Sequence, residues 1–247
     1  VEMWFACQDA LMVSLGTWCG VKKAMRGLNI GGPSLPFDWI RVSIRGVICM
    51  LRERFDSFFD YFFITHDRHF IAEAHSFFHD DLMRPDTVRR YKRRIDRFWR
   101  LAERGNQTRP LSTLFVYALN STVELLDVVE LLNLLKDNFG AAASLLLLLD
   151  GQPEDLTLFF EDSSGLMLHT ISTKHRRAED YSITEPPYVT AYRAPLTAAL
   201  QHVNGGPRPA PSKMLPSVSS LVRDALLEAQ ECPLQHISLG EDLTTSM

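Results

Sequence analysis

Short apolar runs alternate with segments of helical period through residue 149, and this alternation constrains the fold more than any other feature. Leu11 to Leu15, Leu114 to Ala118 and Ser144 to Leu149 are typical of buried strands. Apolar residues at helical spacing over 21–28 and 123–138 predict helices between them. Because parallel sheets are covered on both faces, this order predicts an α/β fold with a mainly parallel central sheet flanked by helices.

The remaining elements are predicted from the same signals. Polar residues and a glycine over 161–165 join two apolar runs, 156–160 and 166–171, which predicts an antiparallel hairpin at an edge of the sheet. A short strand over 76–78 is expected. Helical spacing predicts one or two helices over 42–63, a long helix from Pro85, Asp86 or Thr87 to about Arg104, and a helix over 188–203.

The length of 247 residues and the hydrophobic content of 46% allow a sizeable core. We predict a single α/β domain over residues 1–203, a linker over 204–216 because this segment is rich in Pro and Gly, and a C-terminal helix and tail over 217–247. The chain begins with Val rather than Met, so it could be a fragment or could follow a removed leader.

Charge and composition exclude several partners. A formal net charge of −4 argues against generic nucleic-acid binding, and no apolar stretch is long enough to cross a bilayer. There is no G-x-G-x-x-G motif or P-loop, and no recognised metal-ligand spacing, so we expect no cofactor. The group His66, Asp67, His69 and His75 is expected to be a set of surface side chains. The cysteines are widely separated without a CxxC pair, which favours reduced thiols in the cytoplasm: Cys7, Cys19, Cys49 and Cys232.

A strongly basic segment contrasts with the acidic average. The predicted helix over 87–104 carries seven basic residues outside its apolar side, namely Arg89, Arg90, Lys92, Arg93, Arg94, Arg97 and Arg100. They form either a solvated face, with arginine stems covering apolar surface, or a site for an anionic ligand or acidic partner.

Cys19 is the first candidate for chemistry. Gly16, Thr17 and Trp18 turn the first predicted strand into a helix that starts near Cys19. At a helix N-terminus, unpaired backbone N–H groups and the helix dipole stabilise a thiolate, which is the nucleophilic form of cysteine. The alternative is that Cys19 serves as a small buried apolar residue.

His79 is the candidate partner of Cys19, because it ends the apolar run Phe77-Phe78. If the two meet, the thiolate would attack a carbonyl carbon and the imidazolium would protonate the leaving group. Backbone N–H groups at Trp18, Cys19 and Gly20 could stabilise the oxyanion.

Three residues could orient the histidine: Asp150, Asn120 and Asp38. Cys19, His79, Asn120 and Asp150 all follow predicted strands, so they could lie at the edge where the carboxyl ends of parallel strands meet. Asp38 could instead cap a helix entered at Trp39 or Ile40. Asp80, adjacent to the base, would point elsewhere if the strand continued.

Five short segments appear in order: Ser14 to Cys19, Pro36 to Ile40, Phe77 to Asp80, Arg90 to Phe98 and Leu114 to Val116. Over about residues 11–150 the chain thereby resembles the DUF1796 family, described as putative papain-like cysteine peptidases. The resemblance implies a nucleophile at Cys19 and a base at His79, and it supplies no motif for a third residue. A papain-like core would be α+β with an antiparallel sheet, whereas the alternation favours a parallel one, and we base the architecture on the alternation.

Two functions of different classes follow. One is a cysteine peptidase or amidase that transfers an acyl group of a peptide or amide substrate through Cys19 and His79. The other is a non-catalytic binding module for an anionic or glycan-like ligand, with the arginine-rich helix or the strand-end cleft as its surface.

Overall fold

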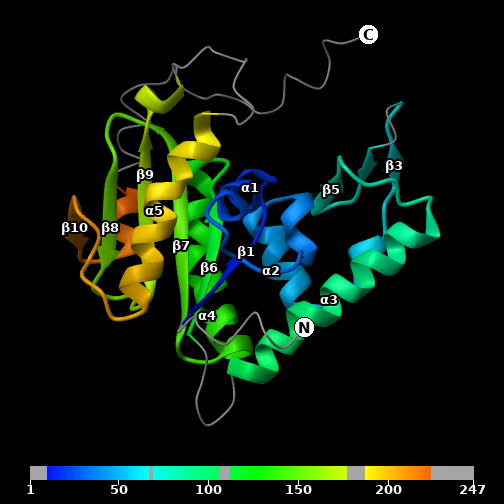
Figure 1. Cartoon of the computed structure of the whole chain (residues 1–247), viewed down its shortest axis with the longest axis horizontal. Coiled ribbons are helices and arrows are strands. Elements are labelled where there is room, and N and C mark those ends of the chain that lie inside the picture. The colour runs from blue at the N-terminus through cyan, green and yellow to red at the C-terminus, as the bar shows by residue number, and fades with distance from the viewer. Residues whose placement is uncertain (1–9, 67–68, 106–111, 177–186, 224–247) are drawn as a thin grey trace.

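The computed structural model describes residues 10–66, 69–105, 112–176 and 187–223. Its centre is a six-stranded sheet, here sheet A, in which the strands follow the order β1-β6-β7-β9-β8-β10 (Figure 1). These strands are β1 (Ala10–Ser14), β6 (Ser112–Ala118), β7 (Ala143–Gln152), β9 (Leu166–Ser172), β8 (Leu156–Phe160) and β10 (Ser212–Leu215).

Sheet A is mainly parallel. The strands β1, β6, β7 and β9 run in one direction, β8 is antiparallel to β9, and β10 is parallel to β8. Consecutive residues point to opposite faces of a strand, and in β6 both sets are apolar: Leu114 and Val116 face one layer of helices, Phe115 and Tyr117 the other. The predicted α/β class is therefore confirmed.

Helices cover both faces of sheet A. On one face lie α1 (Gly20–Gly27) and α5 (Pro187–Val203), whose apolar residues share a core with β6 and β7. The opposite face is covered by α2 (Ile44–Arg52), α3 (Pro85–Gly105) and α4 (Val128–Phe139), which form the larger core with the short 3₁₀ helices η2 (Pro36–Trp39), η3 (Asp56–Phe59) and η4 (Thr122–Asp127). A further 3₁₀ turn, η5 (Thr173–Arg176), follows β9.

A second, smaller sheet, here sheet B, is antiparallel and has the order β2-β5-β4-β3. In Figure 1, β3 and β5 lie on the side of the molecule opposite β10. The strands are β2 (Arg41–Val42), β3 (Phe63–Ile64), β4 (Phe70–Ile71) and β5 (His75–Phe77). The sequence predicted only the last of these, one residue late. Strands of two residues are too short to show the alternation by which strands are recognised.

Two sequence predictions need correction near the C-terminus. The hairpin of β8 and β9 is antiparallel as predicted, but it does not form the edge of the sheet, because β10 pairs with β8. The segment 204–216, predicted as a linker, contributes this strand. Residues 218–223 are helical, with the Ser217 hydroxyl accepting a hydrogen bond from the Ser220 N–H at 3.0 Å, and the rest of the predicted tail lies outside the described residues.

The sequence predicts one or two helices over 42–63, and the structure has α2 and the 3₁₀ helix η3 in this range, followed by β3. The helix α2 ends at Arg52. Arg54 and Phe55 have φ values of 52° and 66°, in the left-handed region, and this turn breaks the helix.

Candidate functional site

Cys19 lies where the sequence predicts it, between the end of β1 and the first residue of α1. It is the N-cap residue of α1, its side chain is 8% exposed, and the first turn of the helix contains no acidic residue. The backbone carbonyl of Cys19 accepts a hydrogen bond from the Lys23 N–H at 2.9 Å, so the helix is regular from its start. Cys19 is thus a largely buried residue at a helix N-terminus.

The turn before Cys19 is held in an unusual conformation. Gly16 and Thr17 have φ values of 91° and 74°, and the Thr17 hydroxyl donates a hydrogen bond to the carbonyl of Ala118 at the end of β6. A Cβ atom at Gly16 would lie 2.8 Å from Cγ1 of Val42. Glycine is therefore required at position 16, and the turn is fixed against both sheet A and β2.

Cys19 opens onto a pocket of about 340 Å³. Its lining comes from the turn before α1, the end of η2, the start of β2, and the segments beside β4 and β5, and consists of Trp18, Cys19, Trp39, Ile40, Arg41, His69, Phe78 and His79. The pocket therefore lies between the edge of sheet A and sheet B, and it contains both residues of the expected pair.

His79 reaches this pocket from sheet B. It follows β5, is exposed, and presents its ring edge-on to Trp39 with 6.3 Å between ring centroids. Within the part of the chain that the structure describes, the His79 imidazole has no hydrogen-bond partner. The prediction that His79 follows a strand of the same parallel sheet as Cys19 is wrong, because β5 belongs to sheet B.

Asp80 turns away from the pocket, as expected for a residue adjacent to His79. Its carboxylate accepts a hydrogen bond from Tyr91 at 2.7 Å and pairs with Arg90. The Arg94 guanidinium lies 3.7 Å from the same carboxylate. Asp80 thus anchors the segment after β5 to α3 and leaves His79 facing the pocket.

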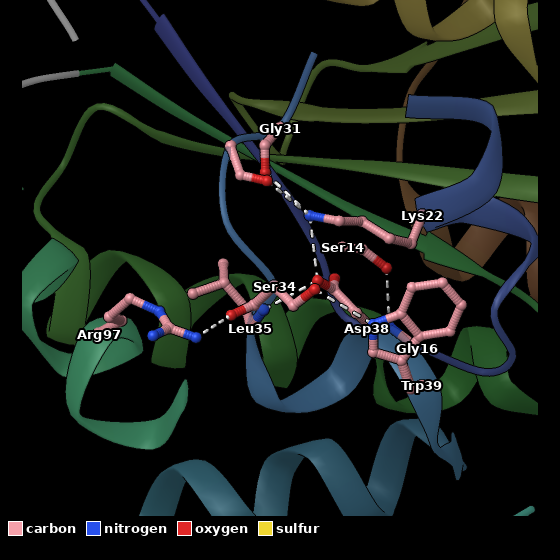
Figure 2. Close-up of polar contacts among 10 residues, drawn as sticks. Ser14, Gly16, Lys22, Gly31, Ser34, Leu35, Asp38, Trp39 and Arg97 are labelled. Atoms are coloured by element: carbon pink, nitrogen blue, oxygen red, sulfur yellow. Dashed lines mark hydrogen bonds and ion pairs between the residues drawn. The ribbon is translucent and has the colours of Figure 1, made fainter. Parts of the chain in front are cut away.

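Asp38 lies behind the pocket wall, in a buried ion pair. Figure 2 shows the Lys22 side chain reaching from α1 toward Asp38 and Gly31. The Lys22 Nζ lies 3.0 Å from Oδ2 of Asp38 and donates a hydrogen bond of 2.9 Å to the carbonyl of Gly31, and the two charged side chains are 2% and 0% exposed. This pair joins α1, which begins directly after Cys19, to η2, whose last residue, Trp39, lines the pocket.

The Asp38 carboxylate also caps the backbone, although not as predicted. Oδ2 accepts the Leu35 N–H at 2.8 Å, at the start of η2, and no helix begins at Trp39 or Ile40 because the chain enters β2 there. Oδ1 is buried and has no hydrogen-bond partner among the described residues. Burial raises the pKa of Asp38, against the opposing effects of the Lys22 ammonium and the Leu35 N–H.

Asn120 follows β6 at the carboxyl edge of sheet A, whereas Asp150, predicted to follow a strand, lies within β7, which extends to Gln152. Neither residue lines the pocket. The backbone N–H of Asn120 donates to Glu124 at 2.7 Å. Asp150 accepts a hydrogen bond of 2.6 Å from the Tyr192 hydroxyl, and the Tyr192 ring contacts Trp18 edge-on at 6.2 Å. Asp150 is therefore connected to the pocket through the side chains of Tyr192 and Trp18.

Glu124, which connects sheet A to α2, is not among the residues that the sequence predicts for the site. Its carboxylate accepts hydrogen bonds from the Tyr117 hydroxyl at 2.7 Å and from the Ile44 N–H at 3.0 Å. Burial and this carboxylate raise the pKa of Tyr117. An acidic residue in a predicted helix gives no signal that it binds a tyrosine of a neighbouring strand.

The basic residues of α3 are largely engaged within the molecule. Arg89 pairs with Asp86, Arg90 pairs with Asp80, and Arg97 donates to the carbonyl of Ser34 at 2.7 Å. Arg94 is 7% exposed and stacks on Tyr91 at 4.5 Å. These contacts favour a structural role, while an anionic ligand at this helix stays a prediction.

His66, His69 and His75 are expected to be surface side chains, and this expectation holds for only some of them. His66 is exposed, but His75 is buried and its Nε2 lies 2.9 Å from the carbonyl of Phe58. Asp67 lies outside the described residues. Among the residues that the structure describes, no three His, Cys, Asp or Glu side chains are grouped to hold a metal ion, and none of the helices is long and apolar enough to cross a membrane.

Comparison with known proteins gives one family match. Residues 10–69 match the model of the DUF1796 family, whose description is "Putative papain-like cysteine peptidase". This segment includes Cys19, Asp38 and His69, and it ends before His79. The resemblance noted in the sequence is thus supported over the N-terminal part of the chain.

A curated relative is an uncharacterized protein, R408, of Acanthamoeba polyphaga mimivirus. It is 39% identical over 51 residues, which cover 20% of this chain and 23% of the relative, so the match spans less than a quarter of that protein. No solved structure matches the chain significantly.

Proposed function

We propose that the protein is a cysteine hydrolase, a peptidase or an amidase, in which Cys19 is the nucleophile and His79 is the general base. The observation that carries this proposal is that Cys19 and His79, far apart in the sequence and held by different sheets, line one pocket. The description of the family matched by residues 10–69 supports a peptidase at family level. A cytoplasmic location stays part of the proposal.

The expected reaction uses groups at the pocket. His79 takes the proton of the Cys19 thiol, and the thiolate attacks the carbonyl carbon of the substrate. The imidazolium then protonates the leaving amine as the carbon–nitrogen bond breaks, which leaves a thioester on Cys19. Water, deprotonated by His79, attacks the thioester, and the acid product and the thiol are released.

The position of Cys19 favours the first step. Backbone N–H groups of the first turn of α1 point toward the N-terminus of the helix, where Cys19 is the N-cap residue. There they stabilise negative charge on the sulfur and on an oxyanion. Asp38, Asn120 and Asp150 do not line the pocket, so we propose a dyad in which Trp39 orients the imidazole through its ring contact.

The test is the rate of Cys19 alkylation by iodoacetamide as a function of pH, with Cys19→Ser identifying the labelled site. We expect labelling to stay fast near pH 6, where an ordinary thiol with a pKa of about 8.5 reacts slowly. His79→Ala should remove this fast labelling. His69→Ala is the matched control, because His69 lines the same pocket, and it should retain fast labelling.

A different labelling result would contradict the proposed function. Slow labelling that follows the titration of an ordinary thiol and is the same in the wild type and in His79→Ala would mean that Cys19 is structural. The binding-module hypothesis would then replace the enzyme.

A further inference from the structure

We propose that the pocket selects acyl substrates that carry a negative charge, and that Arg41 is the residue that contacts the charged group. This inference rests on the proposed function and deepens it, because it names the class of substrate. The evidence is the charge of the lining, the state of Arg41 and the shape of the wall beside it.

The described lining of the pocket is basic. It contains one arginine and two histidines, Arg41, His69 and His79, and no aspartate or glutamate. Arg26, which is exposed, adds a further positive charge beside the pocket, with its guanidinium 6.0 Å from the ring centre of Trp39. The nearby Asp80 carboxylate is bound by Arg90 and Tyr91. A negatively charged substrate therefore meets attraction in the pocket, whereas a positively charged one meets repulsion.

Arg41 differs from the arginines of α3. Several of those bind a carboxylate or a carbonyl of the protein, whereas Arg41 is exposed and pairs with no carboxylate among the described residues. Its guanidinium lies over the ring of Phe78, 4.5 Å from the ring centre. This stacking holds the plane of the guanidinium and leaves its N–H edges available, which suits a carboxylate or another planar anion.

The backbone places Arg41 close to the reacting groups. Arg41 is the first residue of β2 and is paired with Ser76 of β5, the strand that leads to Phe78 and His79. The aromatic rings of Trp18, Trp39 and Phe78 form much of the remaining wall. Apolar walls exclude water and strengthen an ionic contact, so a single arginine can discriminate between charged and neutral substrates.

The test compares two alkylating reagents of similar size, iodoacetate and iodoacetamide. Both form a carbon–sulfur bond with the Cys19 thiolate as iodide leaves with the electrons of the carbon–iodine bond, but only iodoacetate is negatively charged. We measure the ratio of the two rate constants, iodoacetate over iodoacetamide, and divide it by the ratio for N-acetylcysteine in the same buffer.

We expect the wild-type ratio to exceed that of N-acetylcysteine and to fall as salt is added. Arg41→Gln should lower it about tenfold. Arg41→Lys, which keeps the charge, should retain most of it. Arg54→Gln is the matched control, because Arg54 is also exposed and stacks on an aromatic ring, Trp99, at 4.4 Å, but lies outside this pocket, so its ratio should equal that of the wild type.

Two failures are distinguishable. If Cys19 reacts rapidly but Arg41→Gln leaves the ratio unchanged, the inference about Arg41 is overturned and the proposed hydrolase stands. If Cys19 reacts with both reagents no faster than N-acetylcysteine, the proposed function is overturned, and the inference that rests on it is overturned as well.

Discussion

Sheet A and sheet B are built in opposite ways. The strands β6 and β7 of sheet A are long and buried on both faces, and neighbouring strands pair in parallel across distant parts of the sequence. In sheet B three of the four strands have two residues, and the edge strand β3 exposes Phe63 and Ile64 to 53% and 46%. Sheet A therefore owes its stability to burial, whereas sheet B depends on what it is attached to.

This difference matters because the candidate pair is divided between the two sheets. Cys19 follows β1 of sheet A, and His79 follows β5 of sheet B. The geometry of the pair thus depends on the contacts that fix one sheet against the other. Substitutions that remove these contacts should lower the free energy of unfolding, and the expected losses can be ranked from the largest to the smallest.

The largest effect is expected at the Lys22–Asp38 pair, which joins α1 to the segment leading into β2. Lys22→Met leaves the Asp38 carboxylate buried without its partner charge, since both side chains are inaccessible to solvent. We expect the free energy of unfolding to fall by about 3–5 kcal/mol in urea denaturation.

The double variant Lys22→Met with Asp38→Asn is the control. Asparagine keeps an acceptor for the Leu35 N–H without the charge, so the double variant should be more stable than Lys22→Met alone. A single variant that costs less than about 1 kcal/mol would show that the pair does not connect the two regions energetically.

A smaller effect is expected at the contact between the turn after β1 and β2. Gly16→Ala introduces a Cβ at a φ of +91° and 2.8 Å from Val42, so it combines backbone strain with a steric clash. Gly205→Ala has a similar φ of +86° but no atom within 4 Å, so it measures the strain alone.

We expect Gly205→Ala to cost about 1 kcal/mol and Gly16→Ala about 2–4 kcal/mol in the same denaturation assay. Gly16→Ala should also alter the rate of Cys19 alkylation. Equal costs for the two variants would mean that the turn can move away from β2.

The smallest effect concerns pH and sheet B. Burial lowers the pKa of His75 from its ordinary 6.5, and its Nδ1 is buried without a partner among the described residues. The unfolded chain therefore binds a proton below about pH 6.5 before the folded protein does, and the free energy of unfolding falls as the pH decreases through this range.

We expect a loss of about 1 kcal/mol between pH 7 and pH 5.5 that is absent in His75→Phe, whose ring can take the same stacked position on Phe58. His66→Gln, a change at an exposed histidine, should keep the loss. A loss of equal size in His75→Phe would place the pH dependence elsewhere in the protein.

The contrast between the sheets also explains what the sequence could predict. The start of α1 at Cys19 follows from a local apolar run and a glycine-containing turn, and it was predicted correctly. The strands of sheet B are too short to show a period, so the sequence predicts that His79 follows a strand but assigns that strand to the same sheet as Cys19. The pairing of β10 with β8 depends on residues distant in sequence, and its Pro- and Gly-rich surroundings predicted a linker.

The sequence also contains no pattern that predicts the burial of Lys22. Lys22 and Lys23 are neighbours on the same helix, and only the tertiary structure distinguishes the buried lysine, which pairs with Asp38, from the one beside it. The capping role of Asp38 was predicted in kind, because the short side chain of aspartate suits helix starts, but its ionic partner was not.

The hydrogen bond from Thr17 to Ala118 has a consequence for the order in which the molecule can be assembled. The described residues that line the pocket lie within positions 18–79. The turn that positions Cys19 is nevertheless held by the end of β6, and the backbone N–H of Leu15 also donates a hydrogen bond to the carbonyl of Val116. During synthesis on the ribosome, the segment that carries the pocket emerges first, but β1 can pair with β6 only after residue 118 has been synthesised. The pocket is thus completed late, by a strand that contributes nothing to its wall.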